Sequence, residues 1–107
     1  MQQPTIKRIS VQNMQSQKGN DIPNQFEIFT PEGKYFQSYN TIIAFKPTGA
    51  KGGITKTGVR IPELYLDKEK WNYSVTTGKY RNIFLGESKK ETEAKIKSGV
   101  YKLTELN

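Results

Sequence analysis

The order of local signals along this chain constrains its fold more than any single motif does. Up to Leu66 the pattern is one of short strands divided by turns, whereas helix signals appear only after that residue. Runs rich in β-branched and aromatic residues predict strands, and they lie at 5–14, 25–30, 34–39, 41–46 and 63–66. Pro31-Glu32-Gly33 predicts a hairpin between the second and third runs, and 15–24 predicts a polar loop.

The helix signals are strongest at Ser88-Lys89-Lys90-Glu91, which has the pattern of a capping box. This motif predicts a helix that runs to about Lys97 and ends before Gly99. An earlier helix is predicted at 79–85, capped by one of the hydroxyls of Ser74, Thr76 and Thr77 and ended by Gly86. Its Tyr80, Ile83 and Phe84 share one helical face.

Two further signals complete the order of elements. Asp67 predicts the cap of a short turn through Trp71, and 100–106 predicts a closing strand. Strands followed by helices and a final strand are typical of an α+β domain. We therefore predict one domain over 1–107, with a small, mostly antiparallel sheet, two short C-terminal helices and a closing strand.

The side chains lack the usual equipment of an enzyme. Histidine and cysteine are both absent from the 107 residues, which removes the commonest general base and the imidazole and thiolate metal ligands. Several acids have structural explanations, because Glu32 lies in a turn, Asp67 at a cap and Glu91 in the capping box. We predict that the chain is not an enzyme and uses no metal or cofactor.

Positive charge is the main functional signal. The net charge is +7, and no acid lies between Lys46 and Pro62. This stretch includes the glycine-rich segment 47–60, predicted to form a long loop or hairpin tip, and it supplies four candidate phosphate contacts: Lys46, Lys51, Lys56 and Arg60. It is not a phosphate-binding P-loop, since Thr55 stands where the glycine before the lysine is required.

Thr76-Thr77-Gly78-Lys79 allows two interpretations. The free N–H groups at a helix N-terminus bind anions, and Lys79 and Arg81 lie close enough in sequence to assist. Alternatively, Ser74 or Thr76 simply caps the helix.

Aromatic residues interleaved with cations are the third signal. Tyr35, Tyr39 and Tyr80 are candidates for stacking on unpaired bases if they are exposed, and otherwise they belong to the core. For Phe36 and Trp71 we predict burial in the core.

Several short stretches together resemble a family of small, uncharacterised phage-encoded proteins. The pattern combines a Ser-Tyr-x-Thr-x-x-Ala strand, a short apolar strand, a Tyr-Ser-x-Thr-Thr element and a Phe-Leu helix end. It is carried by Asn24-Gln25-Phe26, Phe36 to Tyr39 with Ile42-Ile43-Ala44, Tyr65-Leu66-Asp67, Trp71 to Thr77 and Phe84-Leu85-Gly86. The resemblance covers 24–86 and implies a phage or mobile-element origin but no activity, and the segment around Thr55 is longer here than the pattern requires.

Two functions remain open at this point. The first is a phage accessory protein that binds single strands or the phosphate backbone of nucleic acid in the cytoplasm of the infected host cell. The alternative is a protein-interaction module, such as an inhibitor of a host or defence enzyme or a small virion component. The chain has no apolar run long enough for a membrane span, and self-assembly through a sheet edge is a third possibility.

Overall fold

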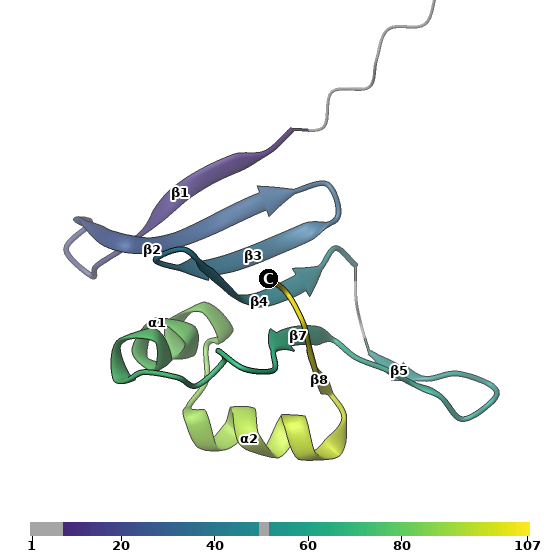
Figure 1. The fold of residues 1–107 in the computed structure, drawn as a ribbon. Helices are drawn as coiled ribbons and strands as arrows, with labels where there is room; N and C mark the ends of the chain where they lie inside the picture. The colour runs from purple at the N-terminus through teal and green to yellow at the C-terminus, as the bar shows by residue number, and fades with distance from the viewer. Residues whose placement is uncertain (1–7, 50–51) are drawn as a thin grey trace, which may run out of the picture.

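Two sheets and two helices make up the computed structural model, which describes residues 8–49 and 52–107 (Figure 1). The larger sheet has six strands in the order β1-β2-β3-β4-β7-β8, and β5 and β6 form a separate two-stranded hairpin. The strands are β1 Ser10–Gln15, β2 Asp21–Thr30, β3 Gly33–Ser38, β4 Thr41–Pro47, β5 Gly53–Ile54, β6 Arg60–Ile61, β7 Leu64–Asp67 and β8 Tyr101–Thr104. The helices are α1 Val75–Leu85 and α2 Lys89–Ser98.

The strand pairing confirms the predicted α+β class. From β1 through β4 to β7, each strand pairs antiparallel with the next one in the sheet, whereas the last pair, β7 with β8, is parallel. Both helices lie between β7 and β8 in the chain, so they form the crossover that a parallel pair requires.

The predicted hairpin between β2 and β3 is confirmed. The Thr30 hydroxyl accepts a hydrogen bond from the Gly33 N–H and donates one to the Gly33 carbonyl. Gly33 has a φ of 155°, and a Cβ at this position would lie 2.3 Å from the carbonyl oxygen of Lys46 on β4. Only glycine therefore lets β3 approach β4 this closely.

Other predicted boundaries were wrong. The part of the 5–14 prediction that the structure describes begins as a strand at Ser10, and residues 5–7 lie outside the described range. The predicted loop at 15–24 is shorter, because β2 already begins at Asp21 and pairs there with Gln15 of β1. Burial of Ile22 against the core favours this longer strand.

Helix α1 begins four residues earlier than the predicted Lys79. Ser74 is its N-cap and accepts a hydrogen bond from the Thr77 N–H. The Thr77 side chain is buried and lies 3.0 Å from the hydroxyl of Ser38 on β3, which fixes the first turn against the sheet. Local sequence could not reveal this contact between residues 39 positions apart. The face predicted for α1 is also corrected, since Ile83 is exposed while Tyr80 and Phe84 pack against the core.

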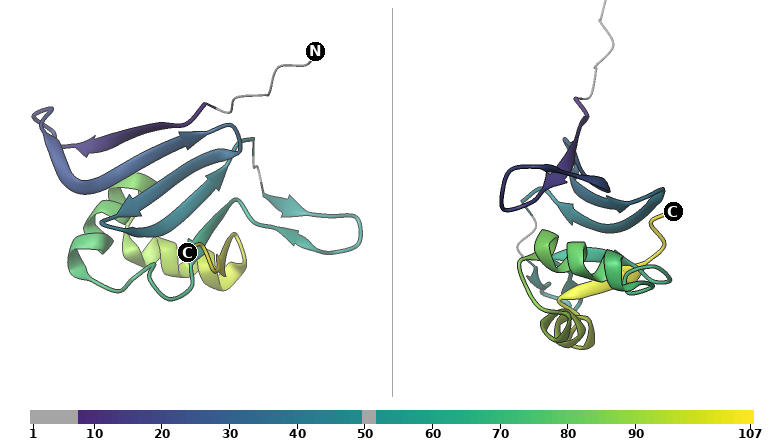
Figure 2. Two further views of the ribbon diagram at one scale, coloured as in Figure 1. Left: turned by 45° about the horizontal axis from the view of Figure 1, so that its top comes forward. Right: turned by 90° about the vertical axis from the view of Figure 1, so that its left-hand side faces the viewer.

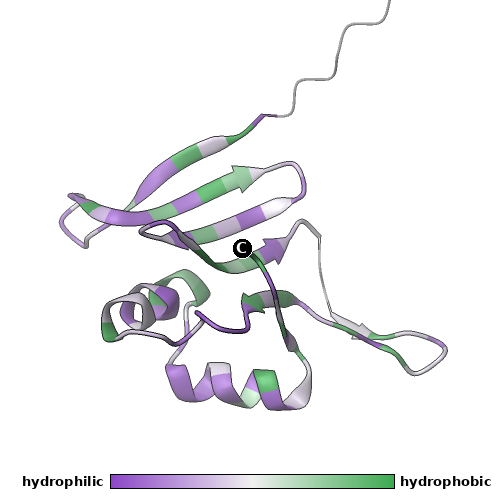
Figure 3. Cartoon of the chain, viewed as in Figure 1, coloured by the Kyte–Doolittle hydropathy of each residue, from purple (hydrophilic) through white to green (hydrophobic). Residues whose placement is uncertain are grey.

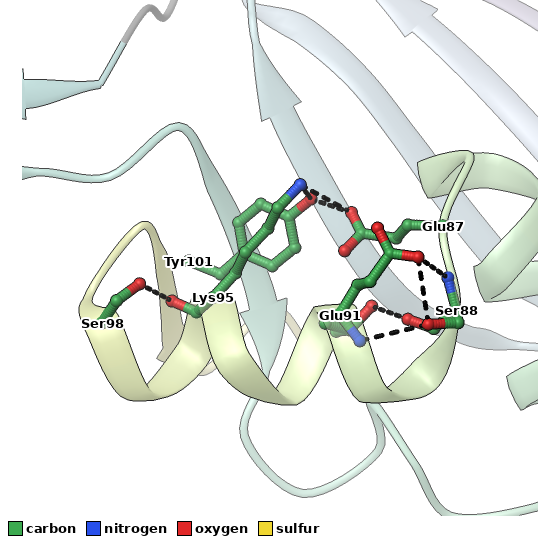
Figure 4. Close-up of polar contacts among 7 residues, drawn as sticks. Glu87, Ser88, Glu91, Lys95, Ser98 and Tyr101 are labelled. Atoms are coloured by element: carbon green, nitrogen blue, oxygen red, sulfur yellow. Dashed lines mark hydrogen bonds and ion pairs between the residues drawn. The ribbon is translucent and has the colours of Figure 1, made fainter.

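Helix α2 forms as predicted. The Ser88 side chain accepts from the Glu91 N–H, and the Glu91 carboxylate accepts from the Ser88 N–H, which completes the capping box (Figure 4). Gly99 ends the helix in the left-handed conformation.

Both helices pack on one side of the curved sheet, as the views in Figure 2 show. Phe84 of α1 stacks on Phe36 of β3, and the Lys95 ammonium of α2 lies near the Tyr101 hydroxyl of β8. The buried hydrophobic core lies between these layers and consists of Met14, Phe36, Ile43, Ala44, Leu64, Leu66 and Tyr101. Burial of Phe36 confirms its predicted role, and Trp71 packs partly buried against the same core.

Candidate nucleic-acid interface

The acid-free basic segment forms an arm that projects from the sheet (Figure 1). We define the arm as residues 53–61, which include β5, β6 and the turn between them. Gly53 pairs with Ile61 and Ile54 pairs with Arg60. The Gly58 N–H donates to Thr55 and the Thr55 N–H donates to Val59, so Gly58, with a φ of 87°, completes a short hairpin turn.

Apolar side chains on the arm are exposed. Ile54, Val59 and Ile61 are 64%, 60% and 47% exposed, and hydrophobic positions colour the arm as well as the core in Figure 3. Ile54 shares a face of the ribbon with Arg60, whereas Val59 and Ile61 lie on the other face. An isolated two-stranded hairpin is marginally stable in water, and these side chains give the arm an apolar surface that is open to solvent.

Cations occupy both the tip and the base of the arm. Lys56 is exposed in the turn, and Arg60 is exposed on β6. The stem of Arg60 lies beside Gly99, and Arg60 and Lys102 line one hollow of about 440 Å³ with Ile96. The described lining of this hollow contains no acidic residue. Lys102, which the sequence analysis missed, therefore joins this basic surface through the pairing of β8 with β7.

The other predicted lysines lie elsewhere. Lys46 is exposed at the end of β4 and lines a separate hollow together with Glu63 and Lys95. Lys51 lies outside the described residues.

Lys79 lies on α1, apart from the arm. It lines a hollow of about 820 Å³ with Tyr73, Gly78 and Lys89 at the N-terminal end of the helix. Ser74 caps this helix, and the Thr77 hydroxyl is engaged by Ser38, so plain capping explains the Thr76-Thr77-Gly78-Lys79 motif.

Arg81 requires a correction, because its side chain is inside the protein rather than on a phosphate-binding surface. It is 1% exposed, and its guanidinium donates to the Trp71 carbonyl at 2.7 Å and to the Asn72 and Asn82 side chains. The guanidinium also lies 5.2 Å from the Trp71 ring. Burial lowers the pKa of Arg81 from its ordinary value. Arg81 thus joins α1 to the segment that precedes it, and its guanidinium is already engaged by these oxygens where it borders the hollow that Lys79 lines.

The three candidate tyrosines do not form one surface. Tyr39 is exposed in the turn after β3, where its φ is 55°. Tyr80 packs partly buried against the core, with the Lys79 ammonium 5.4 Å from its ring. Tyr35 lies in β3 next to the buried Phe36, and alternation along the strand directs its side chain to the face opposite the helices.

On that face, Tyr35 belongs to a row of aromatic side chains. The register aligns Tyr35 with Phe45 and Phe45 with Tyr65, across β3, β4 and β7. The ring centroids are 4.4 Å apart in the first pair and 6.4 Å apart in the second. Since the rings stack on one another across the strands, the row stabilises the sheet and leaves their faces only partly available to a base. The sequence analysis did not predict that Phe45 and Tyr65 belong to this row, because their alignment with Tyr35 depends on the strand order.

A polar cluster around Glu87 also has a structural explanation. The Tyr101 hydroxyl donates to the Glu87 carboxylate, and the Lys95 ammonium lies 3.3 Å from the same carboxylate oxygen (Figure 4). Burial, together with the Glu87 carboxylate, raises the pKa of Tyr101 far above its ordinary range. The cluster joins the loop between the helices to α2 and β8. Within residues 8–49 and 52–107, no group of three or more His, Cys, Asp or Glu side chains could hold a metal ion.

Comparison with known proteins places the chain in a family. Residues 9–99 match DUF8033, a family of unknown function. The chain belongs to this family. The match includes the arm and both helices, whereas the curated proteins and the solved structures gave no significant match.

The helices also bear on the predicted absence of a membrane span. In the part of the chain that the structure describes, no helix is long and apolar enough to cross a membrane.

Proposed function

We propose that this protein binds the phosphate backbone of nucleic acid through the arm, without catalysis. The observation that carries the proposal is a projecting ribbon that contains Lys56 and Arg60, includes no acid and exposes three β-branched apolar side chains. Lys102 extends the same positive surface at the base of the arm.

The shape and the chemistry of the arm suit this role. A two-stranded ribbon fits the major groove of duplex DNA, where cations contact phosphates on either side. The exposed isoleucines and valine can contact sugars and base edges, which requires no sequence-specific hydrogen bond. The exposed Tyr39 remains a candidate for stacking on an unpaired base, so single strands are tested beside duplexes.

We also propose a biological setting. The resemblance to phage-encoded proteins supports an accessory role during infection, in the cytoplasm of the host cell. A protein that acts on nucleic acid there needs affinity and solubility rather than catalytic groups, and the net charge of +7 supplies attraction to polyanions.

Oligonucleotide titrations test the proposal. The wild type and the double variant Lys56→Gln/Arg60→Gln are titrated with single-stranded and duplex oligonucleotides at two salt concentrations. Each lost phosphate contact weakens binding roughly eightfold at about 0.1 M salt, so the double variant is expected to bind on the order of 50-fold more weakly.

The control variant Lys18→Gln/Lys90→Gln removes the same charge from two exposed positions away from the arm. It is expected to retain most of the affinity. Absence of wild-type binding at low salt, or equal losses in the two double variants, would contradict the proposed role of the arm.

The exposed apolar side chains of the arm also fit a second function, recognition of a host or phage protein. A pull-down from host lysate with and without nuclease separates the two. A partner that is retained after nuclease treatment and lost in Ile54→Ser/Val59→Ser would favour protein recognition.

A further inference from the structure

Strand β1 forms one edge of the six-stranded sheet and carries neither the charge nor the proline that commonly protects such edges. Among residues 8–49 and 52–107 it pairs with β2 alone, and the register of that pair shifts between Asn13 and Gln15. Ser10–Gln15 contains no charged residue and no proline, and Val11 and the adjacent Ile9 are 59% and 66% exposed. Natural edge strands usually carry a lysine, a proline or a cover, because free backbone N–H and C=O groups pair with other strands.

The other edge differs in this respect. Strand β8 has four residues, with Lys102 among them, and the Arg60 side chain lies beside the turn that precedes it. It is shorter than the six-residue β1 and carries a charge. An approaching strand therefore meets fewer obstacles at β1.

Residues 8–30, which include β1 and β2, carry no net charge, unlike the rest of the chain. Over 8–30, the two bases Arg8 and Lys18 balance the two acids Asp21 and Glu27. With Lys7, which directly precedes this range, residues 1–30 carry +1 of the net charge of +7, so most of the positive charge lies later in the sequence. Two copies can approach along β1 without the repulsion that their basic arms would cause.

We infer that β1 binds a second copy of this chain, strand to strand, in an antiparallel dimer. The two six-stranded sheets then join into one, and the amide and hydroxyl side chains of Ser10, Gln12 and Gln15 offer both donors and acceptors to their counterparts. Symmetric pairing of one surface with itself is the commonest form of oligomer.

The inference of a dimer does not depend on whether the arm binds nucleic acid. If both hold, the pairing places two arms on one particle, and binding of the first arm raises the effective concentration of the second.

Light scattering during size-exclusion chromatography tests the inference directly. The wild type is expected at twice the chain mass of 12.2 kDa. Gln12→Lys places like charges across the new interface and is expected to elute as a monomer, and Val11→Lys is expected to do the same. Gln17→Lys adds the same charge in the exposed turn after β1 and is expected to remain dimeric.

Circular dichroism establishes that each variant keeps its secondary structure. A wild type at the mass of one chain would overturn the inference. A dimer that survives in folded Gln12→Lys and Val11→Lys would equally overturn it, since a different surface would then join the copies.

Discussion

Two parts of the molecule expose their apolar side chains to very different degrees. One is the body, which consists of the six-stranded sheet with α1 and α2, and the other is the arm. In the body, Phe36 and Leu66 are fully buried beneath the helices. In the arm, Ile54 and Val59 are mostly exposed, although they belong to the same class of large hydrophobic side chains. The difference teaches that large hydrophobic side chains stabilise the body, whereas in the arm they remain exposed and free for the contact with nucleic acid that we propose.

The largest expected effect comes from the body. Phe36→Ala removes a fully buried ring that stacks on Phe84, and we expect a loss of about 3–5 kcal/mol in the free energy of unfolding. Ile54→Ala in the arm is expected to change it by less than about 0.5 kcal/mol. Chemical denaturation measures both, and a comparable cost at the two sites would show that the arm is part of the core.

A smaller loss is expected for Arg81→Met. This change leaves the oxygens of Trp71, Asn72 and Asn82 without their donor, at a cost of about 1–3 kcal/mol. Thermal unfolding measures the loss of stability. The affinity of the folded variant for an oligonucleotide is expected to be unchanged. A large drop in affinity would show that Arg81 does contribute to the binding surface.

Asp67 makes part of the stability of the body dependent on pH. Burial raises the pKa of Asp67, but hydrogen bonds from the N–H groups of Leu106, Lys70 and Glu69 and from the Asn107 side chain lower it, and the net shift is downward. A carboxyl with a lowered pKa stabilises the fold above its ordinary titration range and loses that contribution as pH falls through its folded value. Asp67→Asn is expected to cost roughly 1 kcal/mol at neutral pH. Acid titration of both proteins should show a weaker pH dependence in the variant, and parallel curves would contradict this account.

The smallest change in stability is expected at the tip of the arm. Lys56→Gln removes one exposed cation, so the free energy of unfolding should stay within about 0.5 kcal/mol of the wild type. Binding is expected to weaken, with the slope of log K against log salt reduced by about one. An unchanged slope would show that Lys56 makes no phosphate contact. The other cations of the arm would then have to be tested in the same way.

Local chemistry made much of the fold predictable. The hairpin at Pro31-Glu32-Gly33 and the capping box at Ser88 depend on residues within one turn of each other, and both formed as predicted. The start of α1 was not predicted correctly, because it depends on the distant contact between Thr77 and Ser38. The parallel pairing of β8 with β7 likewise depends on how the helices cross over the sheet.

The candidate site was predictable only where charge alone defined it. The absence of acids between Lys46 and Pro62 led to the arm before its shape was known. Arg81 misled the prediction, because sequence gives no sign that a cation is buried against carbonyl and amide oxygens. Lys102 was missed because strand order and the base of the arm bring it beside Arg60.

Chemical-shift mapping by NMR tests the contrast between body and arm most directly. Amide signals of the labelled protein are followed as a short duplex oligonucleotide is added at low salt. Perturbations are expected to concentrate in the arm and around Lys102, with the neutral β1–β2 end little affected. Perturbations confined to β1 and β2, or spread evenly over the body, would contradict the claim that the arm is the nucleic-acid interface.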